Sequence, residues 1–280
     1  MIKQEIDRIW HWRITVAAAL LLFFVMLLGV SFGPISLDFS KILRTIVGLD
    51  GGLQDEERIL FLQLRLPRVF LAALVGAALA TSGAVYQTVF RNPLADPYLL
   101  GAAAGAGLGA TIALTRGSQS FYAALPLFAF VGAILAVLAT FLISGRAGAN
   151  PATLLLSGIA IGSFATALQT YLQQRKSEVL RPVYSWILGQ LTVADWQVIK
   201  WAGLYIVIAL VVLIRMSRLL DGLLLSDEEA FSLGISPNKI RIIAICAATL
   251  ATATAVSASG LIGFVGIVVP HLVRGLTKRA

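Results

Sequence analysis

Residues 14–32 read ITVAAALLLFFVMLLGVSF, a run of 19 residues with no charged side chain. A helix needs about 20 such residues to cross a hydrocarbon layer about 30 Å thick. The apolar core of a secretory signal is shorter, about 7–15 residues, and no convincing A-x-A cleavage site accompanies this run. We therefore interpret it as a retained first membrane span.

The rest of the chain has a similar composition. Of its 280 residues, 58% are hydrophobic and 13% are charged, whereas soluble domains have about 45–50% and 25%. This predicts an all-α fold, a polytopic transmembrane helix bundle that forms a single domain over residues 1–280. About eight spans are expected, at 14–33, 67–90, 94–115, 121–144, 152–173, 196–215, 240–258 and 261–274.

Small residues recur at four-residue spacing in Gly101–Gly105–Gly109 and Gly76–Ala80–Ala84. Such stripes let helix backbones approach closely in lipid, so tight helix packing is expected.

Charge around the first span predicts its direction. Lys3, Arg8 and Arg13 precede it and acidic residues follow it in 50–57, so the positive-inside rule places the N-terminus in the cytoplasm.

Composition also argues against several functions. The net charge of +8 comes from basic residues scattered between apolar runs, so no nucleic-acid partner is expected. Cys246 is the single cysteine, and His11 and His271 are far apart in the sequence, so neither a disulfide within the chain nor a metal site is expected. The glycines at 105–109 fit helix packing better than a phosphate-binding loop.

The first stretch with functional information is RLPR at residues 65–68, at the mouth of the second expected span. Arg65 and Arg68 are three residues apart and share a helix face. One interpretation is that both arginines anchor the helix at the membrane interface. The other is that they receive Asp or Glu side chains of another protein, because guanidinium groups pair bidentately with carboxylates.

The second stretch is RNPLADP at residues 91–97, where two prolines bracket a polar turn between two spans. Proline removes a backbone donor and disfavours helical geometry in the residue before it. A plain connecting turn explains this pattern. A constriction explains it equally well, because non-helical backbone at membrane depth is buried in protein or lines an aqueous path.

The third stretch lies in an expected cytoplasmic loop, about 216–239. It predicts a short helix that Ser226 caps, with acidic residues at 227–229 and an end at Gly234. A helix on the membrane surface is one interpretation. Because such helices usually carry Lys or Arg on the polar face, the acidic residues favour a protein partner inside the cell. The residues offered for contact are Ala230, Phe231 and Leu233.

Together these stretches resemble the FecCD-type permease family of bacterial ABC importers, which move iron-siderophores, haem and cobalamin. The resemblance covers about residues 65–274. It rests on RLPR at 65–68, on GAA and SG at 76–83, on NPLADP at 92–97, on DEEA and LG at 227–234, and on GFVGIVVPH at 263–271.

The resemblance implies a role for each stretch. Arg65 and Arg68 would meet acidic residues of a periplasmic or lipid-anchored substrate-binding protein. The residues implied for the cytoplasmic gate are Asn92 and Leu94, with Asn150 and Pro151 at a second gate segment where the family often has Ser and Thr. The residues implied for the coupling helix, which sits in a cleft of the ATPase subunit, are Asp227, Glu228, Glu229, Ala230, Leu233 and Gly234.

The expected function is that of the membrane-spanning permease subunit of an ATP-binding-cassette importer in the bacterial inner membrane. It would pair with a second copy or a homologous permease, surrounded by membrane lipids. The chain has no G-x-x-x-x-G-K-[ST] loop, so ATP and Mg²⁺ are expected in a separate ATPase subunit, and no catalytic residue or cofactor is expected here. The sequence does not specify whether the ligand is an iron-siderophore, haem or cobalamin.

Three alternatives remain open. An ion-coupled secondary transporter commonly needs ionisable residues inside its spans, and the expected spans carry almost none. An intramembrane enzyme would need paired His, Asp or Glu within spans. The resemblance implies about ten spans, so the chain is also expected to lack two of them, and an inactive truncated permease is the third alternative.

Overall fold

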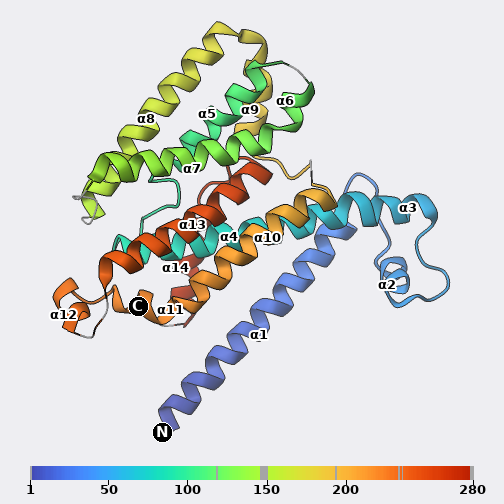
Figure 1. Cartoon of the computed structure of the whole chain (residues 1–280). Coiled ribbons are helices and arrows are strands. Elements are labelled where there is room, and N and C mark those ends of the chain that lie inside the picture. The colour runs from blue at the N-terminus through green and yellow to red at the C-terminus, as the bar shows by residue number, and fades with distance from the viewer. Residues whose placement is uncertain are drawn as a thin grey trace. The chain divides into compact units, whose positions relative to one another are not determined.

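The computed structural model describes residues 2–117, 119–145, 151–192, 194–232, 234 and 236–277. Within these residues the regular structure is helical throughout (Figure 1). Six long apolar stretches of the described chain can cross a membrane, and two shorter apolar helices accompany them. The long stretches are Trp12–Ser31, Asp55–Val89, Leu125–Ser144, Pro151–Arg175, Trp196–Arg215 and Pro237–Ser259, and the shorter helices are Ala102–Thr115 and Val265–Thr277. The expected polytopic all-α fold is confirmed.

Each expected span falls on one of these eight stretches, but in one case the helix begins later in the chain than expected. The span expected at 94–115 is a helix only from Ala102 onward. Residues 92–101 form turns instead, because Pro93 and Pro97 have no backbone N–H to donate to a helical ladder.

The chain divides into two compact units. The N-terminal unit comprises Met1–Ala73, Thr192–Ile199 and Leu272–Ala280, and the central unit comprises Leu74–Leu191 and Lys200–His271.

The N-terminal unit starts with α1 (Ile2–Ser31), α2 (Phe39–Val47) and α3 (Asp55–Ile59). A π-helical turn, η1 (Leu60–Arg65), then leads into α4 (Leu66–Val89). Within this turn the Leu66 N–H bonds to the Phe61 carbonyl, five residues back. Pro67 has no N–H to continue the α-helical ladder, which explains a wider turn at this point.

The central unit holds the rest of α4 and all of the later helices, of which α10 and α14 also contribute residues to the N-terminal unit. They are α5 (Ala102–Thr115), α6 (Gln119–Ala123), α7 (Leu125–Ser144), α8 (Pro151–Arg175), η3 (Ser177–Val179), α9 (Leu180–Ile187), α10 (Trp196–Arg215), α11 (Ser217–Gly222), α12 (Asp227–Ser232), α13 (Pro237–Ser259) and α14 (Val265–Thr277).

Small residues bring helix backbones together in this unit. Helix α5 packs on α7 and α8. A Cβ atom added at Gly105 would lie 2.3 Å from the Gly132 carbonyl oxygen, and one at Gly109 would lie 2.0 Å from that of Phe128. The close packing expected at these two glycines is confirmed. On α4 the close approach is at Gly83 rather than Gly76, since a Cβ atom added at Gly76 meets nothing within 4 Å.

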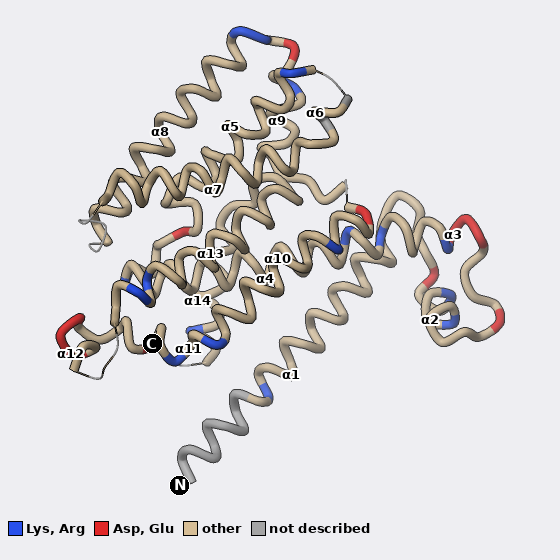
Figure 2. The backbone as a smooth tube through the Cα atoms, viewed as in Figure 1, with Lys and Arg blue, Asp and Glu red and all other residues tan. Residues whose placement is uncertain are grey.

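Charged residues gather at helix ends and in connecting segments (Figure 2). Helix α7 carries none along its 20 residues. This distribution fits a bilayer, because a charged side chain near the bilayer centre is costly.

Candidate functional site

The turn between α4 and α5 is held by its own polar side chains. The Leu94 N–H donates to Asn92 Oδ1 at 2.9 Å, and the Tyr98 N–H donates to Asp96 Oδ1 at 2.8 Å. Tyr98 Oη in turn donates to the Ile262 carbonyl at 3.0 Å. Leu94 is 71% exposed. The turn is therefore an ordered element that presents one large apolar side chain.

Arg91 begins this turn and also reaches the loop before α12. Its backbone adopts a φ of 48°, in the left-handed region. Its Nε donates to the Leu223 carbonyl at 2.8 Å, and its Nη2 donates to the Leu225 carbonyl and to Asp227 Oδ1, the latter at 3.0 Å. One side chain thus ties the end of α4 to the start of α12.

Asp227 is also held by Arg241 of α13. The two Arg241 nitrogens donate to the two carboxylate oxygens at 2.7 Å and 3.0 Å, which is the bidentate geometry of a strong pair. The Arg241 hydrogen bond, together with the charges of Arg241 and Arg91, lowers the pKa of Asp227 below its ordinary value. Asp227 is therefore ionised at neutral pH and joins α4, α12 and α13. We call Arg91, Asp227 and Arg241 the arginine clamp.

Helix α12 has the ends that its sequence predicts. The Glu229 N–H donates to Ser226 Oγ at 3.2 Å, and the Ser226 N–H donates back to Glu229 Oε2 at 2.9 Å. This reciprocal pair is a capping box. Gly234 follows the helix with a φ of 76°, which favours glycine. The predicted cap and the predicted end are confirmed.

The surface of α12 differs in part from the expected one. Ala230 is buried, so it packs the helix inward and presents little surface, whereas Phe231 is 61% exposed. Glu228 and Glu229 are exposed as well. Leu233 lies outside the described residues.

The second expected gate segment is described only in part. Pro151 is the first residue of α8, where a missing N–H costs no hydrogen bond. Asn150 lies outside the described residues.

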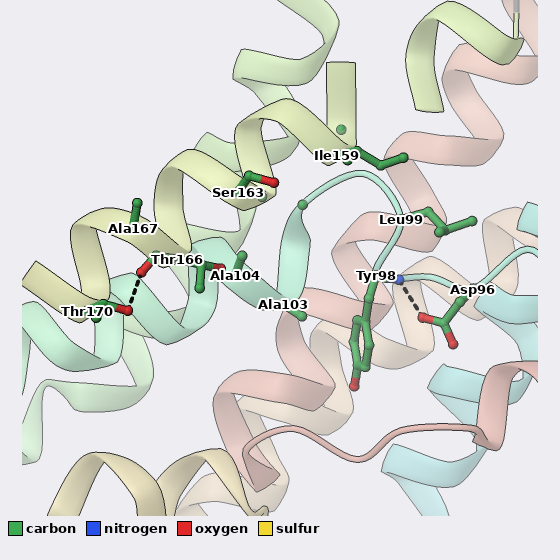
Figure 3. A pocket seen from close by; sticks show the side chains of 13 residues that line it. Asp96, Tyr98, Leu99, Ala103, Ala104, Ile159, Ser163, Thr166, Ala167 and Thr170 are labelled. Carbon is green, nitrogen blue, oxygen red and sulfur yellow. Dashed lines mark hydrogen bonds between the residues drawn. The ribbon is translucent and has the colours of Figure 1, made fainter. Parts of the chain in front are cut away.

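A shallow cavity of about 680 Å³ lies beside the turn between α4 and α5, where the start of α5 faces α8 (Figure 3). Its lining consists mainly of small residues and hydroxyl groups, with Asp96 and Tyr98 at one end and Thr170 at the other. The remaining lining residues are Leu99, Gly101, Ala103, Ala104, Gly158, Ile159, Gly162, Ser163, Thr166 and Ala167.

The two arginines of RLPR have different surroundings in the N-terminal unit. Arg65 is 7% exposed, and its guanidinium donates to the carbonyls of Val30 and Ser31 at 2.7 Å and 2.9 Å and to that of Ile35. It thus binds carbonyls at the end of α1. Arg68 is half-buried and donates to the Thr192 carbonyl at 3.3 Å, so Arg68 is the more accessible of the two.

The clamp is not predicted by the sequence. The stretch 91–97 predicts only a turn, and Arg241 lies at the start of the span expected at 240–258. The signal available was an arginine directly before a proline-bracketed turn and an aspartate at a helix start, but 136 residues separate Arg91 from Asp227.

Comparison with known proteins decides the family. The model of the FecCD transport family matches residues 20–280. The chain belongs to the FecCD transport family. Among curated FecCD-type relatives, the hemin transport system permease protein HmuU of Yersinia pestis is 35% identical over 271 residues, which are 94% of this chain and 78% of that protein.

Two further comparisons agree with the FecCD assignment. The cobalamin import system permease protein BtuC of Halobacterium salinarum is 38% identical over 227 residues, 81% of this chain. A solved structure of an ABC transporter described as metal-chelate type, in an inward-facing conformation, is 28% identical and superposes with a TM-score of 0.83 over 94% of this chain and 81% of that one. The chain spans 61% of the length of BtuC and 65% of that of an iron chelatin permease of Helicobacter pylori.

Proposed function

We propose that this FecCD-family chain is the membrane-spanning permease subunit of an ATP-binding-cassette importer for an iron chelate, haem or cobalamin. The family match and the names of the relatives support this function. The observation that carries the mechanism is the arginine clamp, which joins the capped helix α12 to the turn between α4 and α5.

In this proposal α12 is the coupling helix that docks into a cleft of a separate ATPase, where ATP and Mg²⁺ bind. Glu228, Phe231 and Gly234 are exposed and offer the contact surface. Asp227 and Ala230 fix α12 to the clamp and to α13. Glu229 closes the capping box, and Leu233 is proposed as a further contact residue.

The gate is proposed next to Arg91, at the other end of the clamp. A displacement of α12 pulls on Arg91, and Asn92 and Leu94 come next in the chain. Leu94 is exposed and apolar, which suits a side chain that closes an aqueous path by excluding water. Asn150 and Pro151 are proposed as the second gate segment.

The cavity between α5 and α8 is proposed as part of the ligand path. Its hydroxyl groups and small side chains offer few strong binding contacts, which suits a path that a ligand must leave. Ligand selectivity would then reside in the substrate-binding protein.

Docking of that binding protein is proposed at Arg68, which is accessible for a carboxylate. The same role for Arg65 requires its guanidinium to leave the carbonyls at the end of α1.

The assembly is proposed as two such chains, or one with a homologous permease, in the bacterial inner membrane. Each chain acts as one permease domain, since the family match runs through both compact units. Large apolar side chains exposed on α8, such as Leu156 and Phe164, leave surface for lipid and for a second permease.

Uptake in cells tests the function. The chain is expressed with the ATPase and binding protein from its own genome in cells that lack endogenous importers, and uptake of ferric siderophores, haem and cobalamin is measured. We expect uptake of one ligand class, lost when the Walker lysine of the ATPase is replaced. Uptake that survives this replacement but is abolished by a protonophore would instead indicate a secondary transporter.

A further inference from the structure

Helix α2 carries a stripe of exposed apolar side chains. Their positions follow the spacing i, i+4, i+7 and i+8, so they share one face of the helix. The exposed fractions are 50% for Phe39, 53% for Leu43, 59% for Ile46 and 62% for Val47. Exposed apolar surface of this kind marks a site of interaction.

The other faces of α2 contact neighbouring residues of the N-terminal unit. Ile42 is 1% exposed and packs in a core with Val30, Leu37 and Phe61. On the polar side Lys41 Nζ lies 3.2 Å from Glu57 Oε1. These contacts fix the rotation of α2 about its axis, so the apolar stripe has a defined direction.

Both ends of α2 are also defined. Asp38 accepts a hydrogen bond from the Ser40 N–H at 2.8 Å, and Gly48 ends the helix at a φ of 77°. A helix of 9 residues is marginal by itself in water. The two caps and the buried contact of Ile42 stabilise α2, so the stripe lies on an ordered helix.

The chain places α2 beside the end of a membrane span. Helix α1 ends at Ser31, and the Leu37 N–H donates back to the Ser31 carbonyl at 3.2 Å. The start of α2 therefore stays close to the point where α1 leaves the hydrocarbon layer. The next membrane-crossing stretch begins at Asp55, so the segment that carries α2 must return to the same side of the bilayer.

We propose that α2 lies in the membrane interface at this end of α1, with its stripe among the lipid acyl chains and Ser40 and Arg44 toward the headgroups. Helices that lie in the interface have an apolar face and Lys or Arg on the polar face. Residues 39–47 carry no acidic residue, and Arg44, whose positive charge is exposed, suits anionic phospholipid.

Lipid is favoured over a protein partner because the apolar surface is continuous along the chain with that of α1. Phe32 is 73% exposed and Ile35 is 61% exposed, and both lie between the exposed apolar residues of α1 and those of α2. The bilayer that covers α1 is therefore within reach of the stripe. This inference depends on the membrane-spanning fold and not on the proposed transport function.

Nitroxide accessibility in proteoliposomes tests the inference. The full chain, with Cys246→Ser, is reconstituted in phosphatidylethanolamine and phosphatidylglycerol and labelled at single sites. Leu43→Cys and Ile46→Cys report on the stripe, and Ser40→Cys and Arg44→Cys report on the polar edge. Leu21→Cys in α1 and Asp50→Cys after α2 serve as lipid and water references.

Collisions with oxygen report on lipid, and collisions with a nickel chelate report on water. We expect the ratio of oxygen to nickel collisions to be several-fold higher at 43 and 46 than at 40, and close to the ratio at position 21. Equal nickel access at all four sites of α2 would overturn the proposal, because the stripe would face water. Low access to both reagents at 43 and 46 would also overturn it, because protein would then cover the stripe.

A measurement on the unsubstituted chain guards against variants that do not fold. A phospholipid with a photoreactive group on its acyl chain is activated in the same vesicles, and the labelled tryptic peptides are mapped. We expect labelling of Ile46 or Val47 as well as of α1. Labelling of α1 without any labelling of residues 45–58 would overturn the proposal.

Discussion

Asp227 Oδ1 lies 3.0 Å from Nη2 of Arg91, the residue that begins the turn between α4 and α5. The same carboxylate binds Arg241, whose side chain is only 7% exposed. Three helices thus share one carboxylate through charged hydrogen bonds, which are stronger than neutral ones, and the proposed coupling of α12 to the end of α4 depends on these contacts.

Asp227→Asn is expected to destabilise the chain by about 1–2 kcal/mol, because it removes the charge from both arginine pairs while preserving size. Thermal unfolding of the purified protein in detergent, followed by tryptophan fluorescence, measures the loss. Glu57→Gln is the matched control, since it neutralises a carboxylate outside the clamp, one that pairs with Lys41 and accepts a hydrogen bond from the Gln54 N–H. Identical melting of Asp227→Asn and the unsubstituted chain would show that the clamp contributes nothing.

The clamp also predicts an acid transition. The pKa of Asp227 is lower in the folded chain than its ordinary value, first because of the Arg241 hydrogen bond. The carboxylate therefore adds stability that is fully present above the ordinary pKa of about 4 and is lost as the pH falls through the lower folded value. The difference in melting temperature between Asp227→Asn and the unsubstituted chain should be constant near neutral pH and should narrow as the pH falls below about 4. A difference that stays unchanged from neutral pH down to about pH 3 would contradict this account.

Gly83→Ala is expected to destabilise the chain by roughly 1–3 kcal/mol, because overpacking a close contact forces the backbone to move. The added Cβ would lie 1.9 Å from the Gly266 carbonyl oxygen. Gly76→Ala is the control on the same helix, because its Cβ meets nothing within 4 Å. Gly83→Ala should melt at a clearly lower temperature than Gly76→Ala. Equal melting temperatures would mean that α4 and α14 are not in backbone contact.

Alanine substitutions at the two arginines of RLPR should have different effects on stability and on capture of the binding protein. Arg65→Ala removes the donors to the carbonyls of Val30 and Ser31, so the melting temperature should fall. Arg68→Ala should leave it nearly unchanged and weaken capture of the binding protein in a pull-down assay. If Arg65→Ala melts like the unsubstituted chain, its contacts at the end of α1 are not structural.

Much of this fold was predictable from the sequence because a bilayer imposes simple demands on composition. A stretch such as 125–144 has to be a long apolar helix, and the structure places α7 there. The late start of α5 at Ala102 was missed, since window hydropathy does not register two prolines in an otherwise apolar segment. Capping is local, so Ser226 and Gly234 predicted the ends of α12.

Contacts between distant segments were not predictable in the same way. The buried role of Arg65 depends on the carbonyls of 30–35, which the end of α1 leaves without helical partners. The clamp depends on segments that meet only after the helices pack. Spacing along the chain carries no signal for either contact.

Capture of the ATPase tests the central claim, that α12 is the coupling helix. The chain is co-purified in detergent with the ATPase subunit from its own genome, and Glu228→Arg with Phe231→Ala is compared with Glu56→Arg, which changes an exposed acidic residue of α3. The account predicts that the unsubstituted chain and Glu56→Arg retain the ATPase and that the α12 variant loses it while its melting temperature is preserved. Equal retention of the ATPase by all three chains would contradict the account.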